Sequence, residues 1–406
     1  MKNNLCIAFM LAIIICVASI HNSICGLAFA YEFPNISFHY AGKEYEWNLE
    51  KLEDNHKSVF DMQQKFLRLN RLGLENEVKS LRALNFSDKE ILFNIFPAFE
   101  DVYNKMASDI EVEFVETQIN FIPNSAKMFN FKNGKTGIKI DNQRLLKDMI
   151  SGNHNIEIKT IMQNPRFLAS ELEANTDKRS CQSTSFAGSE SGRRFNLQKA
   201  MSTFNGLVVM PNEVVSFNNV LNTRDNGEPY REAVVIVDGE FTRGIGGGIC
   251  QASTTIYNAV LMAGLEILEV HRHTLPVGYV ERGFDAMVND GGIDMKFKNN
   301  LEYPIYIKTY SKDENVFAEV YGTPMNGIWY KKVSEKVRDI EPPEPKIIPD
   351  IEGKYKDKIK YKGEFYTEKY AKNGYEVKGY LNTYKGDQLI SSKLVRNEKY
   401  LSTQAI

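Results

Sequence analysis

The feature that most constrains this chain is a glycine-rich turn that leads directly into an apolar helix. Residues 244–255 are Gly-Ile-Gly-Gly-Gly-Ile-Cys-Gln-Ala-Ser-Thr-Thr. After Cys250, small and apolar residues recur at helical spacing up to Gly264, a residue type that commonly follows the end of a helix. The pattern predicts a helix whose first turn holds Cys250 and whose apolar face is buried in a protein core.

A cysteine at the start of a helix is placed for nucleophilic chemistry. Free N–H groups and the positive end of the helix dipole stabilise a thiolate, which is the reactive form of cysteine. The backbone amides of Gly247 and Gly248 are candidates for holding a tetrahedral oxyanion, and Gln251 is a candidate side-chain donor.

A cysteine nucleophile also needs a base. The next histidines in the chain are His271 and His273, and the spacing permits a helix, a turn and a returning strand. Such a return would bring one imidazole beside Cys250, with Asp285 as the group that orients it. The candidate catalytic residues are therefore Cys250, His273 and Asp285, with His271 as a candidate substrate contact.

Other interpretations of the same residues stay open. In one interpretation, the glycines form only a tight turn and Cys250 packs as an apolar residue. In another, Cys250 pairs with Cys181 in a disulfide. In a third interpretation, His273 has only a structural role. The cysteines and histidines lack the paired spacing of a zinc site, so no metal and no cofactor is expected.

The N-terminus has the pattern of an export segment. Lys2 precedes an apolar run at residues 5–20, and Ala28-Phe29-Ala30 has the form that signal peptidase accepts. We expect residues 1–30 to be a signal peptide. The alternative is an uncleaved N-terminal anchor, which would be the chain's one contact with the membrane. The protein is then extracytoplasmic: secreted, in the cell wall, or on the outer face of the cytoplasmic membrane.

Composition excludes some function classes. The chain is 43% apolar and 25% charged, as in soluble globular proteins, and its 50 basic and 52 acidic residues leave no basic excess for nucleic acid. Three of the five cysteines fall within residues 1–30, so the remainder is not a disulfide scaffold.

The chain divides by pattern into several regions of mixed α+β class. Residues 31–172 begin with an expected hairpin around Gly42, continue with helices that include a capping box at Ser87 and Glu90, and end in a small α+β module. Residues 173–335 form a central α+β domain. Four prolines predict a linker at 336–350, and residues 351–406 predict a small antiparallel β module.

The central region, from about Ser183 to Gly322, resembles the VanW family. The matching residues are Arg193, Asn196, Ser216-Phe-Asn218, Arg224, Gly246-Gly-Gly-Ile-Cys-Gln251, Ser253-Thr-Thr255, Tyr257-Asn-Ala259, His273, Tyr279, Gly283, Asp285-Ala286 and Asp294. Residues 119–172 resemble the peptidoglycan-binding region that often precedes these domains. The sequence departs from the family pattern at Asn212, where a glycine is usual.

The resemblance implies an activity on peptidoglycan. Some VanW-domain proteins are L,D-transpeptidases, in which a cysteine attacks a stem tetrapeptide, releases the terminal D-alanine and passes the acyl group to a neighbouring amine. Cys250 matches that nucleophile, Ser253 joins the candidate substrate contacts, and Arg193 or Arg224 would bind a stem carboxylate. The expected partners are peptidoglycan stem peptides.

Two alternatives differ in function class. A peptidoglycan endopeptidase or carboxypeptidase would use the same cysteine with water as the acceptor. A noncatalytic wall- or glycopeptide-binding protein would use the Gly-Cys-Gln segment as a ligand cradle.

Overall fold

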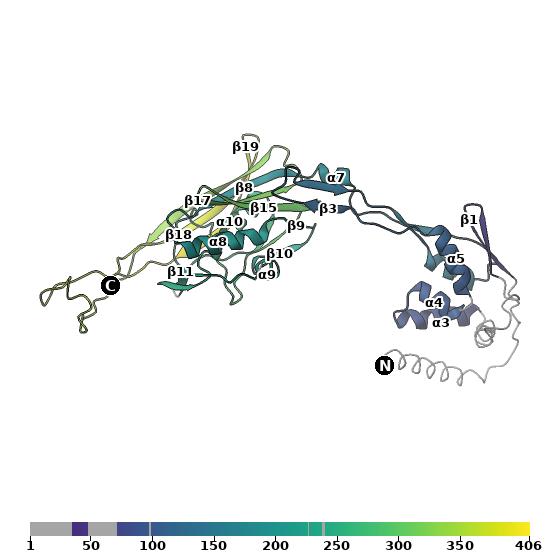
Figure 1. Cartoon of the computed structure of the whole chain (residues 1–406), viewed down its shortest axis with the longest axis horizontal. Helices are drawn as coiled ribbons and strands as arrows, with labels where there is room; N and C mark the ends of the chain where they lie inside the picture. Colours follow the sequence, from purple (N-terminus) through teal and green to yellow (C-terminus); the bar gives the residue numbers. More distant parts are fainter. Residues whose placement is uncertain (1–34, 48–70, 97–98, 226, 238–239) are drawn as a thin grey trace, which may run out of the picture. The chain divides into compact units, whose positions relative to one another are not determined.

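A computed structural model describes residues 35–47, 71–96, 99–225, 227–237 and 240–406 of the protein. The described residues form two compact units, one of the residues up to Glu116 with Gly134–Arg166 and one of Thr117–Asn133 with Phe167–Ile406 (Figure 1). The expected export segment, residues 1–30, lies outside the described residues. Within the described residues, no helix combines the length and the apolar character needed to span a bilayer.

The first unit packs helices against small sheets. Its helices are α3 (Arg71–Ala83), α4 (Asp88–Ile95), α5 (Glu100–Ile110) and α6 (Asn142–Ile150). Its strands are β1 (Ile36–Tyr40), β2 (Lys43–Trp47), β5 (Gly137–Ile140), β6 (Asn155–Glu157) and β7 (Thr160–Gln163). The expected hairpin is confirmed as β1 and β2, which pair antiparallel around Gly42. The capping box is also confirmed, because Ser87 accepts from the Glu90 N–H and Glu90 accepts from the Ser87 N–H.

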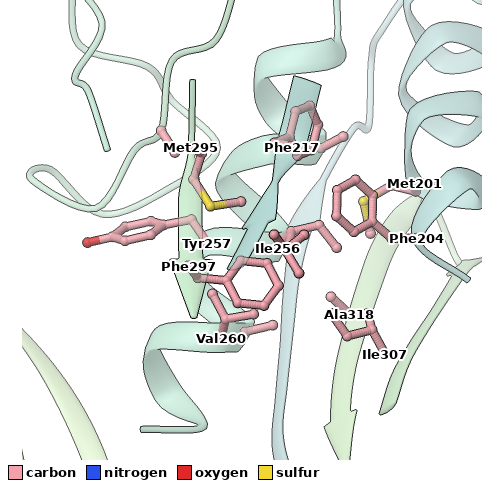
Figure 2. Packing of buried hydrophobic residues seen from close by; sticks show 14 of the residues in the cluster. Met201, Phe204, Phe217, Ile256, Tyr257, Val260, Met295, Phe297, Ile307 and Ala318 are labelled. Atoms are coloured by element: carbon pink, nitrogen blue, oxygen red, sulfur yellow. The ribbon is translucent and has the colours of Figure 1, made fainter. Parts of the chain in front are cut away.

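The second unit is built on a four-stranded antiparallel sheet in the order β8-β16-β15-β9. These strands are β8 (Asp177–Ser185), β9 (Leu207–Val209), β15 (Ile305–Lys312) and β16 (Asn315–Gly322). Two helices, α8 (Ser191–Phe204) and α10 (Ile249–Met262), pack on one face of this sheet. Figure 2 shows the core between them, where Ile256 and Val260 of α10 pack among Phe204, Phe297 and Ile307.

Shorter elements surround that core. They are α9 (Phe217–Thr223), β10 (Val214–Ser216), β11 (Glu232–Val237), β12 (Glu240–Ile245), β13 (Glu266–Glu269) and β14 (Lys296–Lys298). Strands β10, β14 and β13 form one sheet, and β11 and β12 form a hairpin that ends directly before the glycine run. Asn212, which stands where the family usually has glycine, has φ 66°. Asparagine is among the few residues that adopt this left-handed conformation at low cost.

A second hairpin covers the opposite face of the central sheet. It consists of β3 (Gln118–Phe121) and β4 (Phe129–Lys132), followed further along the chain by α7 (Ala169–Glu173). Side chains alternate along a strand, so Tyr306 and Tyr321 lie on the face away from α10, where they pack with Phe129 and Phe131. This packing assigns residues 117–133 and 167–172 to the second unit, although the sequence pattern grouped them with residues 31–116.

The C-terminal residues form an antiparallel sheet of β17 (Ile328–Ile340), β18 (Gly374–Lys385) and β19 (Gln388–Tyr400). The sheet begins earlier than the expected module, because β17 pairs with β18 along its whole length and continues to Ile340. The proline-rich tract that follows carries no helix or strand. The mixed α+β class with several small sheets agrees with the sequence prediction.

Candidate active site

Cys250 is the second residue of α10, as the sequence predicts. Gly248 is the N-cap, and the helix ends in a Schellman motif in which Leu265 donates to Val260 and Gly264 donates to Leu261. The Cys250 side chain is partly exposed, and its Sγ donates to the carbonyl of Val288 at 3.3 Å. Cys181, on β8, is exposed and also a free thiol, so the two described cysteines form no disulfide.

The glycine run is dictated by close packing. A Cβ on Gly247 would lie 2.6 Å from the Val234 carbonyl and 2.8 Å from the Ala233 side chain, both on β11. Gly248 has φ 113°, and a Cβ there would lie 2.8 Å from the Arg193 carbonyl on α8. Because the glycines lack side chains, β11 and α8 pack directly against the turn and fix the position of the start of α10.

Asn196 on α8 joins the elements around this turn. Its amide nitrogen donates to the carbonyls of Arg231 at 2.8 Å and Gly247 at 3.0 Å, and its oxygen accepts from the Arg231 N–H at 2.7 Å. The side chain is fully buried. One amide thus holds the start of β11 and the glycine run together, a role that sequence spacing gave no means to assign.

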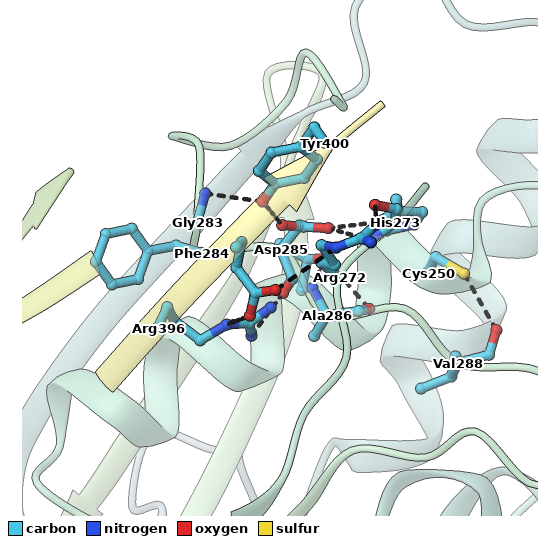
Figure 3. A network of polar contacts seen from close by, with 12 residues as sticks. Cys250, Arg272, His273, Gly283, Phe284, Asp285, Ala286, Val288, Arg396 and Tyr400 are labelled. Atoms are coloured by element: carbon cyan, nitrogen blue, oxygen red, sulfur yellow. Dashed lines mark hydrogen bonds and ion pairs between the residues drawn. The ribbon is translucent and has the colours of Figure 1, made fainter. Parts of the chain in front are cut away.

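His273 and Asp285 form a buried pair beside Cys250 (Figure 3). Asp285 Oδ2 accepts from the His273 backbone N–H at 2.6 Å and lies 2.7 Å from His273 Nδ1. These two contacts fix the ring relative to its own backbone, and the imidazole also hydrogen-bonds with the Cys250 side chain. The side chains are only 5% and 1% exposed, so water competes little for either contact.

The electrostatics of this pair favour a charged imidazole. Burial, the largest influence, lowers the pKa of His273, but hydrogen bonding to Asp285 and interactions with Cys250 outweigh it and raise the pKa to about 9. Burial raises the pKa of Asp285, yet the contacts with His273 and then Tyr400 bring it below its ordinary value. A carboxylate and an imidazolium are therefore the favoured forms at neutral pH.

Side chains of α10 also position the segment around Asp285 by hydrogen bonds to that segment's backbone. Thr254 Oγ1 accepts from the Ala286 N–H at 3.0 Å, and the Asn258 amide donates to the Phe284 carbonyl at 2.8 Å. Both side chains are buried one and two turns along the helix from Cys250. The helix that presents the thiol thus also aligns the acid.

The C-terminal sheet contributes two further contacts. Tyr400 on β19 donates to Asp285 Oδ1, and its hydroxyl accepts from the Gly283 N–H at 2.9 Å. Arg396 donates to the Asp285 carbonyl at 3.0 Å and to Glu398 at 2.7 Å. Sequence reasoning missed both residues, because no motif links β19 to a segment more than 100 residues earlier.

Gln251, the residue after Cys250, is hydrogen-bonded to Arg193 and to β8. The Gln251 amide nitrogen donates to Thr184 Oγ1 at 3.1 Å and to the Ser185 carbonyl at 2.8 Å, so both of its hydrogens are engaged by β8. This differs from the expected oxyanion role of Gln251. Its oxygen accepts from Arg193 at 2.7 Å, and the Arg193 guanidinium lies 5.9 Å from the Tyr279 ring.

Tyr279 is a further residue of the site. Burial raises its pKa far above the ordinary value, and the neighbouring Cys250 adds to that effect. Tyr279 is therefore a neighbour of both the thiol and Arg193. The sequence marks Tyr279 only as part of the family pattern.

Three other candidate residues lie in different surroundings. Arg224 donates to the carbonyls of Thr203 and Asn205, at the C-terminal end of α8, whereas Arg193 is at the N-terminal end roughly 15 Å away. His271 pairs with Glu269 at 3.0 Å on an exposed surface. Ser253 is fully buried, and its hydroxyl has no hydrogen-bond partner in the described structure.

A protein described as uncharacterized protein YoaR, from Bacillus subtilis (strain 168), is 31% identical over 254 residues, which are 61% of this chain and 80% of that protein. A family model described as VanW like protein matches residues 192–321. The chain belongs to the VanW family.

A second VanW-family relative is the vancomycin B-type resistance protein VanW of Enterococcus faecalis (strain V583). It is 30% identical over 142 residues, which are 34% of this chain and 52% of that protein. No solved structure matches the chain. The VanW match at 192–321 contains Arg193, Cys250, His273 and Asp285, whereas Arg396 and Tyr400 lie beyond it.

The described residues contain no group of three or more His, Cys, Asp or Glu side chains arranged to hold a metal ion. The chemistry that the site can offer from its own residues is that of a thiol, an imidazole and a carboxylate in series.

Proposed function

We propose that this protein is an extracytoplasmic cysteine enzyme that modifies peptidoglycan by L,D-transpeptidase acyl transfer through a Cys250 thioester. The observation that carries the proposal is the assembly of Cys250, His273 and Asp285 from α10 and the 270–288 segment. A thiol at a helix start, an imidazole and an orienting carboxylate are the groups that nucleophilic acyl transfer requires. The name of the enterococcal relative supports a role at the cell wall.

The reaction has two steps. The Cys250 thiolate attacks the carbonyl carbon of the third stem residue, and the C–N bond to the terminal D-alanine breaks as the His273 imidazolium gives its proton to the leaving amine. A side-chain amine of a second stem then attacks the thioester, His273 takes its proton, and the thiolate leaves. Atoms balance as one amide broken and one formed, with D-alanine released.

The residues around the thiol have defined parts in this proposal. Asp285 keeps the imidazole in the orientation that directs Nε2 to the thiol. The N–H groups of Gly247, Gly248 and Cys250 donate to no backbone carbonyl in the described part of the chain, so they are the candidates for holding the oxyanion. Arg193, held by Gln251 and partly exposed, is the candidate for the stem's terminal carboxylate.

The test is the muropeptide profile of peptidoglycan treated with purified protein. Wild type should produce new direct cross-links between diamino residues together with free D-alanine, and Cys250→Ala should produce neither. Cys181→Ala is the matched control, since that thiol is exposed and lies on β8, and it should retain activity.

Three outcomes contradict the proposal in different ways. Shortened stems without cross-links would identify a hydrolase that uses water as the acceptor. Equal profiles for wild type and Cys250→Ala would exclude thioester chemistry. Wall binding by both proteins without any chemical change would identify a binding protein.

A further inference from the structure

Tyr400 occupies a position that the proposed reaction does not require by itself. It is the last residue of β19, it is 1% exposed, and its hydroxyl lies between the Gly283 N–H and Asp285 Oδ1. Because the hydroxyl accepts from Gly283, its own hydrogen is directed to the carboxylate. Figure 3 shows this order of contacts, from Gly283 through Tyr400 and Asp285 to His273.

The two oxygens of Asp285 have separate partners. Oδ2 accepts both contacts from His273, and Oδ1 accepts from Tyr400. A carboxylate with donors on both oxygens has one preferred rotation about its Cβ–Cγ bond. Without Tyr400, Oδ1 would be left buried and unsatisfied, and the carboxylate would gain by turning away from the geometry that holds the imidazole.

Arg396 fixes the same residue from its main chain. It is buried, and it donates to the Asp285 carbonyl at 3.0 Å. Arg396 and Tyr400 are four residues apart on one strand, so they lie on the same side of β19. The C-terminal sheet thus contacts both the backbone and the side chain of Asp285.

We propose that Tyr400 is a positioning residue that holds Asp285, and through it His273, in the orientation that Cys250 needs. The inference rests on the proposed function, since it assumes that these three residues act together. It makes the C-terminal sheet part of the reaction centre rather than a separate attachment.

The experiment compares full-length wild type with Tyr400→Phe by the rate of iodoacetamide alkylation at Cys250, measured by mass spectrometry from about pH 5 to pH 10. This reaction needs no wall substrate. We expect Tyr400→Phe to slow Cys250 alkylation near neutral pH by roughly 10-fold, the effect of one lost hydrogen bond to a charged group, and to alter its pH profile. Alkylation of Cys181 in the same sample should not change.

Tyr321→Phe is the matched control. Tyr321 also donates its hydroxyl to a buried carboxylate, Glu319 at 2.5 Å, but it does so on the face of the central sheet away from α10. The control should leave Cys250 alkylation unchanged, and any effect should fall on Cys181, which lies beside Glu319. Equal slowing of Cys250 in both variants would overturn the inference, as would an unchanged profile in Tyr400→Phe.

A second variant covers the case in which Tyr400→Phe does not fold. Incorporation of 3-fluorotyrosine at position 400 keeps the ring and the hydroxyl but makes the hydroxyl more acidic. The inference expects a shifted pH profile at an unchanged melting temperature, and an unshifted profile would overturn it. A Tyr400 effect in a protein whose wild type forms no cross-links would uphold the positioning role and reject the acyl transfer.

Discussion

Cys250 and Cys181 provide an internal comparison of two thiols in one molecule. Cys250 begins a helix and interacts with His273, whereas Cys181 lies in mid-strand near Glu319. Desolvation, followed by the charge of Glu319, raises the pKa of the Cys181 thiol. The two thiols therefore differ in their charged neighbours, and Cys181 is the more exposed of the two.

The first prediction is selective labelling of Cys250 at about pH 6. An ordinary thiol is almost fully protonated there, whereas a thiolate beside an imidazolium remains reactive. We expect a thiol-reactive probe to modify Cys250 at least about 10-fold faster than Cys181, as measured by peptide mass spectrometry. Equal labelling would show that the helix start and His273 do not activate the thiol.

The second prediction concerns stability and pH at His273. Its pKa in the folded protein, about 9, is above the ordinary value of 6.5. The stabilisation by the charged imidazole is therefore fully present below pH 6.5 and is lost as pH rises through about 9. His273→Gln should lower the free energy of unfolding, measured with urea, more near pH 6 than near pH 10. The loss near pH 6 should exceed the loss near pH 10 by up to about 3 kcal/mol.

His271→Gln is the control for that measurement. His271 is exposed and its pairing with Glu269 is a surface interaction, which contributes about 1 kcal/mol or less. If the loss in the free energy of unfolding of His273→Gln does not vary with pH, that result would contradict an imidazolium at this position.

At the level of secondary-structure elements, the turn before α10 has a structural reason for its composition. Gly246 and Gly248 both have positive φ, while Gly247 is limited by its contacts with β11. The three glycines thus satisfy two different constraints, backbone conformation and lack of space. Asn196 then fixes the same turn from α8.

The third prediction tests the packing at Gly247. In Gly247→Ala the new Cβ would meet a backbone carbonyl 2.6 Å away, which cannot move without shifting β11. We expect a loss of about 2 kcal/mol in the free energy of unfolding, typical of overpacking. Gly278→Ala is the control, because no atom lies within 4 Å of a Cβ at that position.

For the whole molecule, the division into units follows the cores rather than the order of the sequence. The β3–β4 hairpin lies in sequence between two stretches of the first unit. Its aromatic rings nevertheless pack on Tyr306 and Tyr321 of the central sheet. Residues 117–133 are therefore part of the second unit's core. A boundary drawn at a single position along the chain separates side chains that share one core.

The fourth prediction follows from that division. A fragment of residues 117–406 in which the first-unit segment, residues 134–166, is replaced by a short flexible linker should unfold in one cooperative thermal transition. A fragment of residues 167–406, which lacks the hairpin, should expose the Tyr306 face and melt at least about 5 °C lower, since several large apolar contacts are lost. Equal melting temperatures would show that the hairpin is not part of this core.

Several elements in both units were predictable because they depend on local sequence. Helical spacing and Gly264 define α10, the Ser87–Glu90 pair defines the start of α4, and alternation with a turn defines β1 and β2. Each of these signals acts over a few residues, where propensity and capping decide the backbone. The family pattern likewise singles out Cys250, His273 and Asp285.

Tertiary structure decided what those residues contact. The Gln251 amide is engaged by β8, Arg224 caps α8 away from the thiol, and Tyr400 reaches Asp285 from the far end of the chain. A side chain's partners depend on which segments the core brings together, and spacing along the chain carries little of that information. The sequence by itself therefore determined the helix that carries Cys250, the proposed nucleophile, whereas only the packing of the C-terminal sheet against the Asp285 segment decided how Asp285 is held.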